Sequence, residues 1–171
     1  GISGSNYESS GNHYRLYSGT ISYVDTNDYE VEFSDVRYYN GGWRYYSGSR
    51  SFALDKYAEI YNGVSKRSID DIYNNRNEAY FVYDEYDDEI DFLRIVRGSE
   101  KSLYGEVKKV DYQDDNFILD TDSAALYWND STIFYDDGEL VGEREISAGD
   151  DVCAVVDVVN GTYYAAAVIV E

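Results

Sequence analysis

An internal repeat restricts the fold of this chain more than any other feature of its sequence. Residues 17–25 match residues 103–111, a shift of 86, and residues 77–84 match residues 150–157, a shift of 73. At the same shift of 73, residues 60–61 match 133–134 and residues 92–96 match 165–169. The shared order predicts that the chain folds twice in the same way. The difference between the shifts, 86 − 73 = 13, predicts an insertion in the first copy, within residues 36–51.

Period-two alternation predicts that both copies are built from strands. In residues 29–33, Tyr, Val and Phe alternate with two Glu, and short apolar runs recur along the chain between Asn-Gly and Asp-Gly turns. The prediction is an all-β protein of two tandem small β-barrels, SH3-like or OB-like, because closure into a barrel removes exposed sheet edges. Residues 68–73 suggest one helical turn, with Ser68 as its cap.

Three segments follow from this reading. A flexible, polar N-terminal arm is expected at residues 1–16, the first barrel with its aromatic insertion at residues 17–98, and the second barrel at residues 103–171. Residues 98–102 are polar and are expected to form the linker.

The charge balance excludes several kinds of partner. The chain has 14 Lys and Arg against 34 Asp and Glu, a formal net charge of −20. Nucleic acids and anionic membranes are bound chiefly by Lys and Arg, so neither is expected as a partner. No apolar stretch approaches the about 20 residues that span a bilayer, and no membrane insertion is expected. The first residue is Gly1, which indicates either a removed leader or a tag scar.

The order of motifs in both copies resembles a known family. The second copy has a Gly-x-Val-x-x-Val-Asp strand at residues 105–111, Asp137-Gly138, Gly149-Asp150 before a Val strand, and a closing apolar strand. This is similar to the small β-barrel repeats found beside S-layer-homology segments in bacterial cell-surface proteins. The resemblance implies a barrel fold and a cell-surface location. The chain departs from that pattern in its density of Tyr, its lack of an anchoring segment, and Asn77-Glu78 in place of Gly-Asp.

Few residues favour enzymatic chemistry, and the chain is expected not to be an enzyme. The single His, His13, falls in the polar arm, where a solvated side chain is expected rather than a catalytic one. The single Cys, Cys153, lies in an apolar run and is expected to be an inert buried thiol. One His and one Cys cannot build the usual zinc site.

Calcium is the more credible cofactor, because it takes carboxylate and carbonyl oxygens. The candidate ligands are acidic residues in turns of the second copy: Asp114, Asp115, Asp120, Asp122, Asp136 and Asp137. The alternative is that these acids form solvated turns and protect strand edges.

The aromatic insertion is the main candidate for partner contact. Its residues Tyr38, Tyr39, Trp43, Tyr45 and Tyr46 flank a Gly-Gly turn. On a hairpin, alternate members line opposite faces, and one face could stack on a neighbouring subunit or on sugar rings. The alternative is a hairpin that folds back onto its own barrel.

These expectations lead to a structural subunit of an extracellular assembly, a surface filament or S-layer. Copies of the chain are expected to associate with each other through Tyr-rich faces and by strand addition. The alternative function is a Ca²⁺-dependent carbohydrate or cell-wall binding module that uses the Trp43 hairpin.

Overall fold

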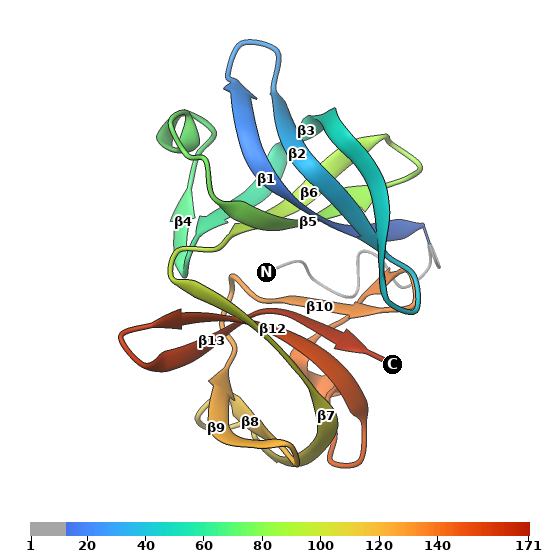
Figure 1. Cartoon of the computed structure of the whole chain (residues 1–171), viewed down its shortest axis with the longest axis vertical. Helices are drawn as coiled ribbons and strands as arrows, with labels where there is room; N and C mark the ends of the chain where they lie inside the picture. The colour runs from blue at the N-terminus through green and yellow to red at the C-terminus, as the bar shows by residue number, and fades with distance from the viewer. Residues whose placement is uncertain (1–12) are drawn as a thin grey trace.

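The computed structural model describes residues 13–171 and is all-β, with two sheets that follow one another along the chain (Figure 1). The first sheet contains β1 (Tyr14–Asp25), β2 (Glu30–Tyr39), β3 (Trp43–Asn62), β4 (Ser65–Arg67), β5 (Glu78–Asp84) and β6 (Glu89–Ile95). The second contains β7 (Ser99–Asp111), β8 (Asn116–Leu119), β9 (Asp122–Tyr127), β10 (Ile133–Asp136), β11 (Glu139–Leu140), β12 (Asp151–Val159) and β13 (Thr162–Val170). Within residues 13–171 there are also two short 3₁₀ turns, η2 (Asp70–Ile72) and η3 (Glu143–Glu145).

In each sheet the strand pairings turn back on themselves. The first sheet has the order β2-β1-β5-β6-β3-β4, and β3 also pairs with β2. The second has the order β11-β10-β13-β12-β7-β8-β9, and β9 also pairs with β13. Strand β3 of the first sheet and strand β9 of the second therefore occupy equivalent places.

The registers confirm the first part of the repeat and correct the last part. Gly19 lies opposite Ala79, and Gly105 lies opposite Val152, as the shifts of 86 and 73 predict. The match of residues 92–96 with 165–169 is wrong by two residues. The pairs are Phe81 with Leu93 and Ala154 with Val168, so the shift there is 168 − 93 = 75. The cause is that β12 and β13 continue pairing to a two-residue turn, whereas β5 and β6 end at a four-residue turn between Asp84 and Glu89.

The glycine that begins the repeat lies where two strands approach closely. A Cβ on Gly19 would lie 2.9 Å from the Cβ of Phe33 on β2, closer than side chains pack. The aromatic ring of Phe33 is fully buried in the core of the first sheet. Glycine at this position therefore lets β1 and β2 come together over that ring.

Several expected boundaries lie elsewhere. Strand β1 begins at Tyr14, inside the segment expected as an arm, and the remaining arm residues 1–12 lie outside the described residues. Most of the expected linker is strand, because residues 99–102 belong to β7 and pair with β12. The helical turn is present as η2, but its cap differs. Asp71 accepts hydrogen bonds from the backbone N–H and hydroxyl of Ser68.

Among residues 13–171, buried apolar side chains form three hydrophobic cores. One is built from the first copy of the repeat alone, its sheet and the η2 region, and one from the second copy alone. The third draws on both, with side chains such as Tyr80, Val82 and Phe92 from the first sheet and Val155 and Ile169 from the second. Because this third core contains side chains from both sheets, the two sheets pack against each other and are not independent domains. Within residues 13–171, no helix is long and apolar enough to cross a membrane.

Candidate functional site

The polar centre of the molecule is a buried ion pair between the two sheets. Arg94 on β6 and Asp157 on β12 have fully buried side chains, and the Arg94 Nη1 lies 2.7 Å from the Asp157 Oδ2. Asp157 also accepts from the backbone N–H groups of Arg97 (2.9 Å) and Gly98 (2.6 Å), which connect the sheets. The pair thus fixes the chain at the crossing from one sheet to the other.

The guanidinium of Arg94 makes further contacts in this buried place. Its Nε donates to the Ser131 hydroxyl at 3.1 Å, and its Nη1 also donates to the Ile95 carbonyl at 2.7 Å. Burial lowers the pKa of Arg94, and the hydrogen bond to Asp157 opposes that shift. An arginine retains its charge under such conditions. Its Nη2 has no hydrogen-bond partner among the described residues. Arg94, Asp157 and Ser131 are all fully buried, and their hydrogen bonds tie β6 and the connection between the sheets to the second sheet.

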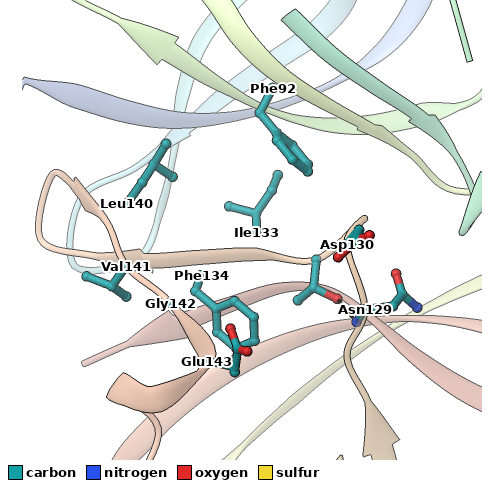
Figure 2. A pocket seen from close by; sticks show the side chains of 10 residues that line it. Phe92, Asn129, Asp130, Ile133, Phe134, Leu140, Val141, Gly142 and Glu143 are labelled. Atoms are coloured by element: carbon teal, nitrogen blue, oxygen red, sulfur yellow. Dashed lines mark hydrogen bonds between the residues drawn. The ribbon is translucent and has the colours of Figure 1, made fainter. Parts of the chain in front are cut away.

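A hollow of about 220 Å³ lies beside this joint (Figure 2). Phe92 points into it from the first sheet, opposite Ile133 and Leu140 of the second, while Asp130 and Glu143 place carboxylates at its margin. Its lining contains no His, Cys, Lys or Arg in the described part of the chain. The titratable groups that line the hollow are the carboxylates of Asp130 and Glu143.

A second hollow, of about 530 Å³, opens at another edge of the joint. Tyr39, Tyr135 and Glu171 are among its lining residues. The hydroxyl of Tyr39 donates to the Glu171 carboxylate, and the hydroxyl of Tyr135 donates to the Tyr14 carbonyl at 3.0 Å. Burial, followed by the bond to Glu171, raises the pKa of Tyr39. The hydroxyls of Tyr39 and Tyr135 therefore both donate hydrogen bonds within the molecule.

Most of the aromatic insertion packs onto its own molecule. Tyr39 is buried in the shared core, and the half-buried Trp43 packs edge-on against its ring at 5.4 Å between centroids. Tyr38 and Tyr46 lie half-buried against the core of the first sheet. Only Tyr45 among these five is largely exposed, at 73%. Four of these residues, Tyr38, Tyr39, Trp43 and Tyr46, therefore follow the interpretation in which the hairpin folds back onto its own molecule.

The acidic residues considered for calcium are spread over separate turns. Asp114 and Asp115 lie between β7 and β8, and Asp136 and Asp137 lie at the β10–β11 turn. Asp120 accepts from the Glu106 N–H, and Asp122 accepts from the Ala124 N–H. Among residues 13–171, no three His, Cys, Asp or Glu side chains are grouped to hold a metal ion.

The prediction of a solvated His13 is wrong. The residue is only 5% exposed, and its ring stacks on Tyr86 with centroids 4.4 Å apart. Its Nε2 lies 3.6 Å from the Asp84 carboxylate. The β5–β6 turn covers it, because the Glu85 N–H bonds to the His13 carbonyl. Cys153 is fully buried, as predicted, and burial raises the pKa of its thiol to about 11.

Asp91 on β6, which no sequence pattern singled out, has a carboxylate with a raised pKa in the folded protein. Burial, followed by the nearby carboxylates of Asp84, Asp55, Asp87 and Glu89, raises the pKa of Asp91 to about 7. Ile90 belongs to the core of the first sheet and Phe92 to the shared core, and Asp91 between them is the extra residue of a bulge in the ladder to β5. Strand neighbours set this environment, and they are not visible in the local sequence.

The Asp91→Asn variant is expected to be more stable than the wild type at pH 8 and similar to it at pH 4. The folded-state pKa of about 7 exceeds the unfolded value of about 3.9, so folded Asp91 binds more protons between these pH values. Stability of the wild type therefore falls as pH rises through that window. Urea unfolding should show a gain of about 1–2 kcal/mol for the variant at pH 8, discounted for solvent screening. Equal pH slopes for both proteins would contradict this account.

The first part of β3 forms a long open edge. Residues 43–53 pair with β2, and β6 joins β3 only from Leu54 onward. Within residues 13–171, no other strand bonds to this stretch on the side away from β2. The sequence could not reveal this edge, because which strand remains unpaired is a property of the topology.

Hydrogen bonds show which backbone groups face outward at this edge. The Ser47 hydroxyl donates to the Ser49 carbonyl at 2.8 Å and accepts from the Ser49 N–H at 3.3 Å. The N–H and C=O of Ser49 are therefore not used in the ladder to β2. In an antiparallel pair such groups point away from the partner strand, here toward open solvent. Arg44 and Arg50 are exposed along the same stretch, and the Arg50 guanidinium lies over the Tyr46 ring at 5.2 Å.

Comparison with known proteins adds no identity. No protein-family model matches the chain, and no curated protein matches it.

Proposed function

We propose that this protein is a structural subunit of an extracellular assembly, a surface filament or layer, in which copies associate by strand addition and through exposed tyrosines. The open edge at residues 43–53 of β3 is the observation that carries the proposal. We also propose that each sheet is a small β-barrel of the SH3-like or OB-like kind. The return pairings of β3 with β2 and of β9 with β13 support that assignment.

The β3 edge is long and uncovered, and it lacks Pro and Lys, although Arg44 and Arg50 lie on it and its ladder with β2 has a bulge. Natural edges are kept short, covered, or interrupted by Pro and Lys. This stretch runs for eleven residues, from 43 to 53, and contains neither Pro nor Lys. An exposed edge of this length is a template for another strand. An open edge of this length favours a protein whose role is to pair with the strand of another molecule.

Exposed tyrosines supply further contact surface. The most exposed are Tyr57 (92%), Tyr45 (73%), Tyr86 (72%) and Tyr104 (56%). Tyrosine rings add buried area at an interface while the hydroxyl remains hydrogen-bonded. The extracellular location follows from the resemblance of the turn and core motifs to cell-surface repeats.

The test is assembly of the full chain at increasing concentration, followed by sedimentation velocity and negative-stain electron microscopy. We expect extended assemblies for the wild type and their loss in a Ser49→Lys/Ser51→Lys double variant, because charged lysines on an edge strand oppose pairing. Asn27→Lys, in the exposed β1–β2 turn, is the control for added positive charge away from the edge. Dispersed wild-type monomers at every concentration would sink the proposal.

A further inference from the structure

We propose that the strand received by the β3 edge is β9 of a second copy, so that molecules join head to tail. This inference rests on the proposed function and names the partner of the same edge. Three features of the two edges support it: their place in the sheets, their hydrogen-bond state and their charge.

The two edges occupy equivalent places in the two sheets. Strand β3 pairs first with β2 and reaches β6 later, while β9 pairs with β8 and reaches β13 only at Leu126 and Tyr127. Residues 122–125 of β9 therefore have no strand on the side away from β8 within the described chain. The two stretches differ in length, with eleven residues on β3 and four on β9. Strands β4 and β11 and residues 99–106 of β7 also have a single strand neighbour within the described chain.

Both edges carry a similar side-chain substitute for a missing strand. On β3, the Ser47 hydroxyl bonds the backbone of Ser49. On β9, the Asp122 carboxylate accepts from the Ala124 N–H at 2.8 Å. In each case a side chain two residues earlier bonds the backbone. On β3 the group belongs to a residue paired with β2, whereas Ala124 lies in the irregular stretch between Asp122 and Leu126, where no residue pairs with β8. An added strand would replace these local bonds with ladder bonds.

The charges of the two edges are opposite. Residues 43–53 contain Arg44 and Arg50 and no acid, although the chain as a whole carries −20. Residues 120–127 contain Asp120 and Asp122 and no base. Lys101 lies 4.0 Å from Asp122, but this pair is exposed, and such pairs contribute little. Opposite charges across paired strands stabilise the pairing.

Pairing of two β3 edges with each other is disfavoured by the same charges. An antiparallel arrangement centred on Ser47 would place Arg44 of each copy opposite Arg50 of the other. Like charges directly opposite one another are destabilising. The contact between unlike edges is heterologous, and a heterologous contact that does not close produces a filament.

The experiment blocks one edge at a time in the full chain. Ser49→Pro removes an N–H that β2 does not use, and Ala124→Pro removes an N–H that only Asp122 uses. Proline is tolerated on an edge strand where its missing N–H faces solvent. Circular dichroism and thermal unfolding of each variant confirm that it is folded. An Arg44→Glu/Arg50→Glu double variant tests the same edge without proline.

We expect each proline variant alone to remain monomeric and a 1:1 mixture to form heterodimers that do not grow further, because each variant retains only one of the two edges proposed to pair. The Arg44→Glu/Arg50→Glu variant should also lose assembly. Assembly of Ala124→Pro alone, or a mixture that stays monomeric, overturns β9 as the partner. If the wild type assembles in these cases, the proposed function stands without this inference. A monomeric wild type overturns both.

Discussion

Replacement of Asp157 by alanine is expected to lower the free energy of unfolding by about 3–5 kcal/mol, the cost of leaving a buried charge without its partner. The Arg94 guanidinium is fully buried, and its closest charged contact is the Asp157 carboxylate at 2.7 Å. The variant also orphans the N–H groups of Arg97 and Gly98. Urea unfolding monitored by circular dichroism measures the loss, with the wild type under the same conditions as reference.

A second variant separates the orphaned charge from the rest of the network. Arg94→Met/Asp157→Asn removes both charges, and the Asn side-chain oxygen can still accept from the N–H of Gly98. Replacing a buried ion pair by groups of similar size is often close to neutral. We therefore expect the double variant to be more stable than Asp157→Ala and than Arg94→Met alone. The single variants Arg94→Met and Asp157→Asn complete the cycle, and a double variant that loses the sum of their two losses would show that the pair is not coupled.

The location of this pair explains why its loss reaches both sheets. Ser131, which accepts from Arg94, precedes β10, and Asp157 belongs to β12. The network therefore joins β6 to the segment before β10, to β12 and to the connection between the sheets. The shared core lies around the same joint. We infer that the two copies of the repeat unfold cooperatively.

The sequence predicted the features that depend on local pattern. Alternation along residues 29–33 indicated a strand, and β2 runs from Glu30 through this stretch. The match of Gly19 with Gly105 predicted the equivalent registers of β1 and β7. These succeed because period-two burial and a glycine at a close approach are each written in a few adjacent residues.

The features that failed depend on distant segments. Arg94 sits in an apolar run that predicts a strand, but its burial requires Asp157, sixty-three positions away. His13 became buried because the β5–β6 turn covers it. The shared core uses the outer faces of both sheets, so strands such as residues 79–83 and 152–156 are apolar on both faces. A continuous apolar run indicates that both faces are buried but does not tell which segment covers the second face. Tyr39 and Trp43, candidates for a partner contact, pack at that joint.

Substitution of Gly98 by alanine is the other change with a large expected effect. An added Cβ would lie 2.1 Å from the carbonyl oxygen of Val158 and 2.9 Å from its carbonyl carbon. These are backbone atoms of β12, which is paired on both sides, so they cannot move as a flexible side chain would. The N–H of Gly98 is also fixed by its 2.6 Å bond to Asp157. Overpacking of this kind costs about 1–3 kcal/mol, and weakening a hydrogen bond to a charged group costs about 1.5–3 kcal/mol more.

The expected loss is therefore about 3–5 kcal/mol, read from urea unfolding. Gly142→Ala is the matched control, because Gly142 has an extended backbone with φ −95° and an added Cβ there meets no atom within 4 Å. Its unfolding free energy should stay within about 0.5 kcal/mol of the wild type, as for an ordinary surface change. If Gly98→Ala has the same unfolding free energy as Gly142→Ala, the close contact between Gly98 and the backbone of β12 is absent. The bond between Asp157 and the Gly98 N–H would then not depend on that contact.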